Sequence, residues 1–257
     1  SGSGKVTFPG TPAESNYEIT VTKNGYSTAK TYDADSGNPN PDPGHLTVVE
    51  SETTSSSFVI DLLSSKTVRT WRWWEVGSTT PLGDIPFSMR GDKTIGSDGQ
   101  GAPIYKYFAN HQTNPTGELP INNLEWDNYT ITIDDSVTGY DILESCLPQP
   151  RPLSPNISTT TDIYLVPDTA HSLLVDVTDE NGILLENAVV RLYRAGFDDT
   201  KNTSGCGQTF WGDLSKGTLS ESNPYSADVS LSGYEDITVA EIDVDGASKI
   251  TISLETL

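Results

Sequence analysis

Tyr129-Thr-Ile-Thr-Ile-Asp-Asp-Ser-Val-Thr-Gly139-Tyr140 is one of three copies of a short pattern that ends in Gly-Tyr. The other copies are Tyr17-Glu-Ile-Thr-Val-Thr-Lys-Asn-Gly25-Tyr26 and Tyr225-Ser-Ala-Asp-Val-Ser-Leu-Ser-Gly233-Tyr234. Because successive side chains of a strand point to opposite faces, alternation such as Ile131 and Ile133 against Thr130 and Thr132 predicts a β-strand. Repetition at a domain-sized period indicates tandem modules, which are typical of stalks, adhesins and assembly scaffolds.

A glycine turn made of small polar residues precedes the second and third copies, as Thr113-Asn-Pro-Thr-Gly117 and Thr203-Ser-Gly-Cys-Gly207. Ser1-Gly-Ser-Gly4 takes the place of that turn in the first copy, so we expect the first module to hold only the second half of a sandwich. Unpaired strand edges invite other strands to add. We therefore expect a weakly ordered first segment, or one completed by another surface-protein chain or by its own missing N-terminal half-module.

The repeats divide the 257 residues into three parts. We expect a partial β-sandwich module over residues 1–63, which is the C-terminal half of a module, and complete β-sandwich modules over residues 64–167 and 168–257. In the first part we expect closing strands at Leu46–Glu50 and Ser57–Asp61 and a surface loop along the proline-rich run from Asp33 to Gly44. In the third part, Asp179-Glu-Asn-Gly182 predicts a tight turn, because glycine adopts a positive φ without strain.

The composition is that of an all-β protein. Hydrophobic residues make up 34% of the chain, in short alternating runs that 22 glycines and 16 prolines interrupt. The 15 basic and 36 acidic residues give a net charge of −21, which argues against nucleic acid and anionic membranes as partners. Because no apolar run approaches the roughly 18 residues of a membrane span, we expect no direct membrane contact in this segment.

Aromatic residues are concentrated in Trp71-Arg-Trp73-Trp74. Trp71 and Trp73 share one face of a predicted strand over Thr67–Val76, and together they form a candidate platform on which sugars or a partner's side chains could stack. The alternative is packing in the core or between modules. Trp126 and Trp211 follow the two glycine turns, and we expect them to share one core position.

Acidic residues occur in close pairs, among them Asp33 with Asp35 and Asp243 with Asp245. Calcium takes several oxygen ligands, so these four residues are the candidate metal ligands, although none of the pairs fits the EF-hand spacing. The alternative is that they are solvated turn carboxylates. We expect no other cofactor.

Cys146 and Cys206 are the two cysteines of the chain. A disulfide between them would close a loop of 60 residues (206 − 146) and join neighbouring modules. The chain-entropy treatment of such a loop gives roughly 4 kcal/mol of stabilisation. The alternative is two free thiols that do not meet.

Catalytic patterns are absent from the sequence. His45, His111 and His171 stand in three different segments and belong to no metalloprotease, nucleophile-elbow or Cys-His signature, so we do not expect an enzyme. Arg90-Gly91-Asp92 matches the tripeptide that integrins read on exposed loops. Gly-Asp is also ordinary turn chemistry, and we interpret the match as chance.

The third part resembles carboxypeptidase regulatory-like and Cna-B-like modules in the order of its segments. These are Leu173-Leu-Val-Asp-Val, Asp179-Glu-Asn-Gly182, Leu185-Glu-Asn-Ala-Val-Val-Arg-Leu192, the glycine turn and Tyr225 to Tyr234. Lys93-Thr-Ile-Gly96, Leu124-Glu-Trp-Asp127 and Thr169-Ala-His-Ser-Leu-Leu174 look like phrases of bacterial surface proteins that carry a pilin-like N-terminal segment. The resemblance implies tandem transthyretin-like, that is immunoglobulin-like, β-sandwiches without a peptidase site.

Cna-B-like modules often contain an isopeptide bond between a lysine of the first strand and an asparagine of the last. Here the resemblance is incomplete, because the third part has neither residue in those strands, and Lys66 and Asn156 precede the predicted strands of the second. We expect no such bond, and we expect the cysteines to supply any cross-link.

The sequence and the resemblance together predict a non-enzymatic extracellular structural segment of a bacterial cell-surface protein, either a stalk or a pilus-like component. Its partners would be other surface-protein chains. The alternative is an adhesin that binds carbohydrate or a protein through Trp71, Trp73 and the loop from Asp33 to Gly44.

Overall fold

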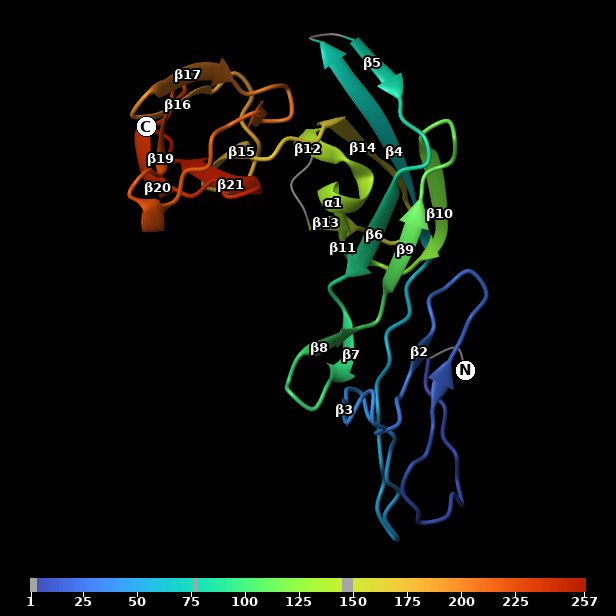
Figure 1. Ribbon diagram of the computed structural model, residues 1–257. Helices are drawn as coiled ribbons and strands as arrows, with labels where there is room; N and C mark the ends of the chain where they lie inside the picture. The colour runs from blue at the N-terminus through green and yellow to red at the C-terminus, as the bar shows by residue number, and fades with distance from the viewer. Residues whose placement is uncertain (1–3, 76–77, 145–149) are drawn as a thin grey trace.

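Strands dominate the structure, a computed structural model that describes residues 4–75, 78–144 and 150–257 (Figure 1). Its helical elements are one α-helical turn, α1 (Asp135–Thr138), and one 3-10 turn, η1 (Leu219–Glu221). The all-β fold class predicted from alternation and composition is confirmed.

The middle of the chain forms a two-layered sandwich. Its strands are β4 (Ser64–Glu75), β5 (Ser78–Pro81), β6 (Pro86–Gly91), β9 (Phe108–Gln112), β10 (Glu118–Leu124), β11 (Asp127–Thr132), β12 (Tyr140–Glu144), β13 (Arg151–Leu153) and β14 (Ser158–Pro167). One sheet has the order β10-β4-β14-β12, with β5 paired to β4, and the other has the order β13-β11-β6-β9. Alternate residues of each strand enter the core between the sheets, which includes Val68, Met89, Ile131, Leu153 and Ile163.

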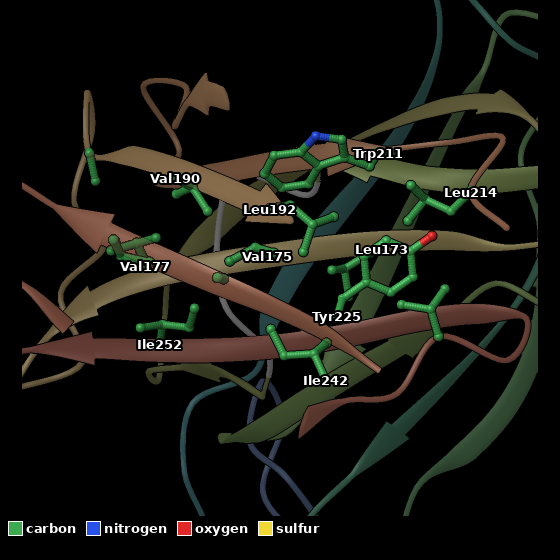
Figure 2. Close-up of a cluster of buried hydrophobic side chains, with 14 of the residues drawn as sticks. Leu173, Val175, Val177, Val190, Leu192, Trp211, Leu214, Tyr225, Ile242 and Ile252 are labelled. Atoms are coloured by element: carbon green, nitrogen blue, oxygen red, sulfur yellow. The ribbon is translucent and has the colours of Figure 1, made fainter. Parts of the chain in front are cut away.

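The C-terminal part forms a second sandwich with its own core (Figure 2). Its strands are β15 (Ser172–Asp179), β16 (Val189–Arg194), β17 (Phe197–Asn202), β18 (Gln208–Trp211), β19 (Tyr225–Ser230), β20 (Ile237–Ile242) and β21 (Ala247–Leu254). The sheets have the orders β18-β15-β21 and β17-β16-β19-β20. Trp211 and Tyr225 are the largest side chains of this core, and Leu173, Val175 and Val177 enter it from β15.

The two sandwiches share one plan. In each, the first strand pairs in parallel with the last over eight consecutive positions, β4 with β14 and β15 with β21. The predicted glycine turns occupy equivalent places in the two sandwiches. In each, an amide of the first strand donates a hydrogen bond of 2.8 Å to the carbonyl of the turn glycine, Thr70 to Gly117 and Val177 to Gly207. Both glycines have a positive φ, 76° and 64°, which explains why glycine stands there.

The predicted turn at Asp179 is confirmed, since the Gly182 amide donates to the Asp179 carbonyl at 3.0 Å and Gly182 has a φ of 78°. Residues 103–108 divide into β8 (Pro103–Tyr105), which pairs with β7 (Thr94–Ser97), and β9, which pairs with β6. The intervening Lys106 and Tyr107 connect β8, which lies in a small sheet with β7, to β9, which lies in the sheet β13-β11-β6-β9 of the middle sandwich.

The first 60 or so residues contain little regular structure. Their strands are β1 (Thr20–Val21), β2 (Ala29–Lys30) and β3 (Asn40–Pro41). The closing strands expected at Leu46–Glu50 and Ser57–Asp61 are not formed, and isolated bridges, Tyr17 to Leu46 and Tyr26 to Leu62, stand in their place. Such strands need neighbouring strands, and none of the described residues pairs with residues 53–61 in a sheet.

The proline-rich run is not simply a surface loop, because β3 joins β7 at the edge of a three-stranded sheet, β3-β7-β8. Asn38 and Asp42 donate to the Ile95 carbonyl at 2.9 and 3.0 Å, through the side-chain amide and the backbone amide respectively. Pro41 is tolerated because it lies at an edge. These bonds attach the first segment to the middle sandwich.

In the described part of the chain, no helix has the length and apolar character needed to cross a membrane.

Candidate functional site

The candidate aromatic platform lies on the outer face of β4. Val68 and Thr70 of this strand are buried, so the alternate residues, including Trp71 and Trp73, point away from the core. The two indoles share one face, as the period of two predicted. Both indoles are half-buried rather than fully exposed. The sandwich core is therefore ruled out as their location.

Trp71 is held by an ionic group on the neighbouring strand. Its Nε1 donates to Asp162 Oδ1 at 2.8 Å, and Arg69 binds both oxygens of the same carboxylate at 2.8 and 2.9 Å. The parallel register of β4 and β14 sets Arg69 opposite Asp162, which explains the bidentate contact between the guanidinium and the carboxylate. The Asp162 carboxylate raises the pKa of Arg69, so this guanidinium stays charged beside the indole.

Trp73 packs edge-to-face against Tyr164 of β14, with ring centroids 6.0 Å apart and planes at 90°. Thr79 of β5 lies opposite Trp73. The outer face of the sheet thus carries two indoles and a phenol beside an Arg–carboxylate pair. Flat apolar rings next to hydrogen-bonding groups are suited to stacking against a sugar or a partner's side chain.

A second set of residues joins the two sandwiches. Asp141 of β12 is 2% exposed, and its Oδ2 accepts bonds from the Thr169 amide at 3.2 Å and from the Thr169 hydroxyl at 3.3 Å. Burial raises the pKa of the Asp141 carboxyl above its usual range, against the opposing effect of these hydrogen bonds. Asp141 comes from the last part of one sandwich and Thr169 immediately precedes the first strand of the next, so the junction is held by directed bonds.

Cys206 lies in the glycine turn before β18 and is disulfide-bonded. Its predicted partner, Cys146, lies outside the described residues. The pairing of Cys146 with Cys206 therefore stays a prediction.

The candidate calcium ligands form two separate pairs. In the first segment, Asp35 Oδ1 accepts the amides of Gly37 and Asn38, each at 2.7 Å, while Asp33 lies 3.8 Å from the His45 ring. Asp35 therefore closes a turn.

In the C-terminal sandwich, Asp243 accepts the Leu219 amide at 2.6 Å and Asp245 pairs with Lys216 at 3.1 Å. No three metal-binding side chains come together in residues 4–75, 78–144 and 150–257. Calcium binding at these positions stays a prediction.

The lysine that the resemblance brought into consideration, Lys66, lies inside β4 and not before the first strand as expected. It is 2% exposed, and its Nζ donates to the Thr161 hydroxyl of β14 at 3.2 Å. Burial, and secondly the nearby Arg151, lowers its pKa to about 8. The position that faces this lysine carries a threonine, which offers no acyl group.

A second buried charge lies in the C-terminal sandwich. Asp176 of β15 is 1% exposed, receives the Gln208 amide at 2.6 Å and pairs with Lys249 at 2.9 Å. The absence of isopeptide bonds stays a prediction for both sandwiches.

The histidines do not assemble into a site. His111 bonds the Tyr107 hydroxyl at 2.9 Å and lies against Phe87, and burial lowers its pKa. His45 lies in the first segment, and the backbone carbonyl of His171 caps Leu214 in the third part. Each histidine therefore has a local structural role.

Two other sequence features have structural explanations. Arg90 donates to the Tyr105 hydroxyl at 3.0 Å and lies over its ring, so the Arg-Gly-Asp tripeptide is folded against the protein. The shared core position expected for the two tryptophans is wrong, because Trp211 is 2% exposed and Trp126 is 46% exposed. Counted from the glycine turns, the residue equivalent to Trp211 is the buried Ile121.

Sequence reasoning missed Asp141 and Asp162, and it placed Lys66 before the first strand and not inside it. Each of the three owes its role to a strand or loop that is distant in sequence. Asp162, for example, meets Trp71 only through the β4–β14 register. The one sequence signal that could have identified them was a single charged residue within a run of alternating apolar and polar residues.

No protein-family model matches the sequence, and no curated protein matches it. Among solved structures, the shaft pilin SpaA of Lactobacillus rhamnosus GG is similar at 12% identity and a TM-score of 0.29, over 76% of this chain and 98% of that one. The Streptococcal ancillary pilin has 11% identity and a TM-score of 0.30, over 83% and 70% of the two chains. GBS52, the minor pilin of Streptococcus agalactiae, has 12% identity and a TM-score of 0.26, over 76% and 96%. Superpositions this loose define neither a family nor a role for this chain.

Proposed function

We propose that this chain is a non-enzymatic structural segment of an extracellular cell-surface assembly, a stalk or pilus-like component. The observation that carries the proposal is the arrangement of two complete sandwiches in series, each with its own core and the same strand plan. Modules of this kind are stable units that project or join other components. The proposed partners are other surface-protein chains.

The junction supports a semi-rigid arrangement. Strand β12 of the middle sandwich lies beside β15 and β18 of the next, and Thr169 is fixed to the buried Asp141. The disulfide proposed between Cys146 and Cys206 would add a covalent restraint at the same place. A net charge of −21 keeps such a segment soluble.

Small-angle X-ray scattering of the full chain tests the proposal. For the parent chain, which has the Thr169–Asp141 contact, we expect a single extended particle with one narrow distribution of dimensions. For Asp141→Ala, which removes that contact, we expect a broader distribution of dimensions. Asp198→Ala, on an exposed face of the C-terminal sandwich, is the matched control and should scatter like the parent chain. A parent chain that already samples many inter-module angles would contradict a stalk.

The outward aromatic face favours a second candidate, a carbohydrate-binding adhesin. Trp71 and Trp73 are displayed beside Tyr164 and the Arg69–Asp162 pair, which suits stacking with polar anchoring. Screening on a glycan array should show binding that Trp73→Ala removes, while Trp126→Ala, which removes a more exposed indole elsewhere on the middle sandwich, leaves it intact. Equal binding by both variants and the parent chain would exclude this platform.

A further inference from the structure

The first and last strands of the middle sandwich lie side by side and run in the same direction. β4 and β14 pair in parallel from Ser65 with Ser158 to Arg72 with Leu165. The chain therefore enters β4 at one end of the pair and leaves β14 at the other. Figure 1 shows the first segment beyond the end where β4 begins, and the C-terminal sandwich follows the end of β14.

This geometry decides how the middle sandwich responds to tension along the chain. A pull on the two flanking segments draws β4 and β14 past each other along their own axes. The backbone hydrogen bonds of a parallel pair are evenly spaced and slanted, so sliding strains all of them at once. In a pair that is pulled open from one end, the bonds instead break one after another.

Tension cannot bypass the β4–β14 pair within its sheet. In the order β10-β4-β14-β12, β4 reaches β14 and β12 only across this pair. In the sequence, β12 leads to Cys146, and β14 leads to the linker before β15. Tension that leaves through the predicted disulfide or along the backbone must therefore first cross from β4 to β14.

Side chains add further bonds across the same pair. The contacts that join the two strands are Ser65 with Ser158 at 2.7 Å, Lys66 with Thr161 at 3.2 Å, and Arg69 with Asp162 at 2.8 and 2.9 Å. Trp71 Nε1 donates to the same Asp162 carboxylate at 2.8 Å. A bidentate Arg–carboxylate contact is among the strongest hydrogen-bonded pairs in proteins. All these bonds lie across the surface along which the strands would slide.

The C-terminal sandwich offers an internal comparison. Its first and last strands, β15 and β21, also pair in parallel over eight positions. Its bidentate Arg–carboxylate pair, however, joins Arg191 of β16 to Asp198 of β17, at 2.8 and 2.7 Å. The same chemistry therefore lies across the terminal strands in one sandwich and away from them in the other.

We infer that the β4–β14 pair is a mechanical clamp, which sets the force at which the middle sandwich unfolds when the chain is pulled. The backbone ladder and the group formed by Arg69, Asp162 and Trp71 resist sliding together. Forced unfolding is governed by the rate of unfolding, which such a clamp lowers. The inference goes beyond the proposed structural role, and its use in a cell rests on that role, since a stalk or pilus-like component is pulled along its length.

Single-molecule pulling of the full chain in reducing buffer tests the inference. Handles at the two termini load the β4–β14 pair along the strands. From Ser64 to Pro167 the middle sandwich contains 104 residues (167 − 64 + 1), and its unfolding releases a chain of roughly 340–370 Å. From Ser172 to Leu254 the C-terminal sandwich contains 83 residues (254 − 172 + 1), which give roughly 270–300 Å, so the two events are distinguishable.

A second handle position changes the direction of the pull. Asn156 is exposed, and its amide donates to the Leu62 carbonyl at 3.4 Å, so it lies at the end of the pair where β4 begins. A handle at Asn156 in place of the C-terminal one pulls the two strands apart from that end. The middle sandwich should then unfold at a lower force than in the end-to-end pull.

A matched pair of variants isolates the side-chain bonds. Asp162→Ala removes the three bonds to Arg69 and Trp71, and it should raise the unfolding rate of the middle sandwich at a fixed end-to-end force by at least about tenfold. In the pull from Asn156 the same variant should unfold like the parent chain, because the bonds near Ser65 break first. Asp198→Ala should leave the unfolding rate of the C-terminal sandwich unchanged. Neither carboxylate belongs to a core, so both variants fold.

Three results would overturn the inference. Equal forces in the two pulling directions would mean that the β4–β14 pair is not loaded along its strands. An unchanged end-to-end rate for Asp162→Ala would mean that its bonds do not resist sliding. Equal acceleration by Asp162→Ala and Asp198→Ala would mean that any ion pair between strands has this effect. Because scattering measures the angles between sandwiches and pulling measures the strength of one sandwich, the structural role and the clamp can fail separately.

Discussion

Replacing Lys66 by methionine should make the middle sandwich more stable. The Lys66 side chain is 2% exposed, and no carboxylate of the described residues lies within ion-pair distance of its Nζ. A methionine of similar length keeps the apolar stem and removes the buried charge. Replacing an unpaired buried charge by a packed apolar side chain is stabilising in general.

The magnitude follows from the pKa of the lysine. Burial lowers it from 10.5 to about 8. At ~1.36 kcal/mol for each pH unit, this difference corresponds to ~3 kcal/mol of destabilisation at pH 7. Loss of the bond to the Thr161 hydroxyl offsets about 1 kcal/mol, so we expect a net gain of ~2 kcal/mol.

The pH dependence distinguishes this explanation from a packing effect. Between pH 8 and 10.5 the unfolded chain binds a proton at Lys66 and the folded chain does not, so stability rises with pH across this window. Above it both states are neutral and the charge no longer matters. Lys66→Met should therefore lack the rise, and at the top of this window it should be less stable than the parent chain by up to about 1 kcal/mol, because only the lost bond to Thr161 then distinguishes the two.

Urea unfolding at pH 7, 9 and 10.5, followed by tryptophan fluorescence, measures these free energies. Lys216→Met makes the same chemical change at an exposed lysine that pairs with Asp245 and Glu221, and it should not stabilise the protein. A Lys66→Met variant that is less stable than the parent chain at pH 7, or that keeps the full rise above pH 8, would refute the reasoning.

Three further predictions concern a turn, a cross-link and the junction. Gly207→Ala should destabilise the C-terminal sandwich by more than about 1 kcal/mol in thermal unfolding, because φ is +64° and a Cβ there would lie 2.7 Å from the Leu184 Cβ; an unchanged midpoint would contradict this. Intact mass under non-reducing conditions should be two hydrogen atoms lighter than the sequence mass if Cys206 pairs with Cys146, and Cys206→Ser should cost roughly 4 kcal/mol by loop entropy; a cysteine-linked dimer would show a different pairing. Burial raises the pKa of the Asp141 carboxyl in the folded chain, so its contribution to the free energy of unfolding is present at low pH and is lost as pH rises through the folded pKa. Asp141→Asn should remove this pH dependence from thermal unfolding measured across the acid range. An unaltered pH dependence in the variant would assign the effect to other groups.

The local features of the fold were readable from the sequence. Alternation along Tyr129 to Ile133 predicted a strand with a buried face, and both isoleucines are buried in the core. The glycine turns and the shared strand face of Trp71 and Trp73 were predictable for the same reason, since a period of two and a positive φ are properties of a few adjacent residues. Which face the two indoles occupy was not predictable from alternation.

The errors arose where the outcome depends on distant strands. Residues 57–61 have the alternation of a strand and form none, because a strand needs a neighbouring strand and none of the described residues pairs with them in a sheet. Pro41 was assigned to a surface loop, yet Asn40 and Pro41 find an edge at β7. Trp126 was expected in the core because its distance from the glycine turn was misjudged, whereas Ile121 fills that position.

The sequence by itself determined the strand periods, the turns, the all-β class and the net charge, since each depends on residues that are neighbours in the chain. Only the tertiary structure decided that Asp162 holds Trp71, that Lys66 is buried with no carboxylate of the described residues in ion-pair distance, and that Asp141 meets Thr169 at the junction. These contacts join residues 28 to 95 positions apart, and their existence depends on parallel register and on burial.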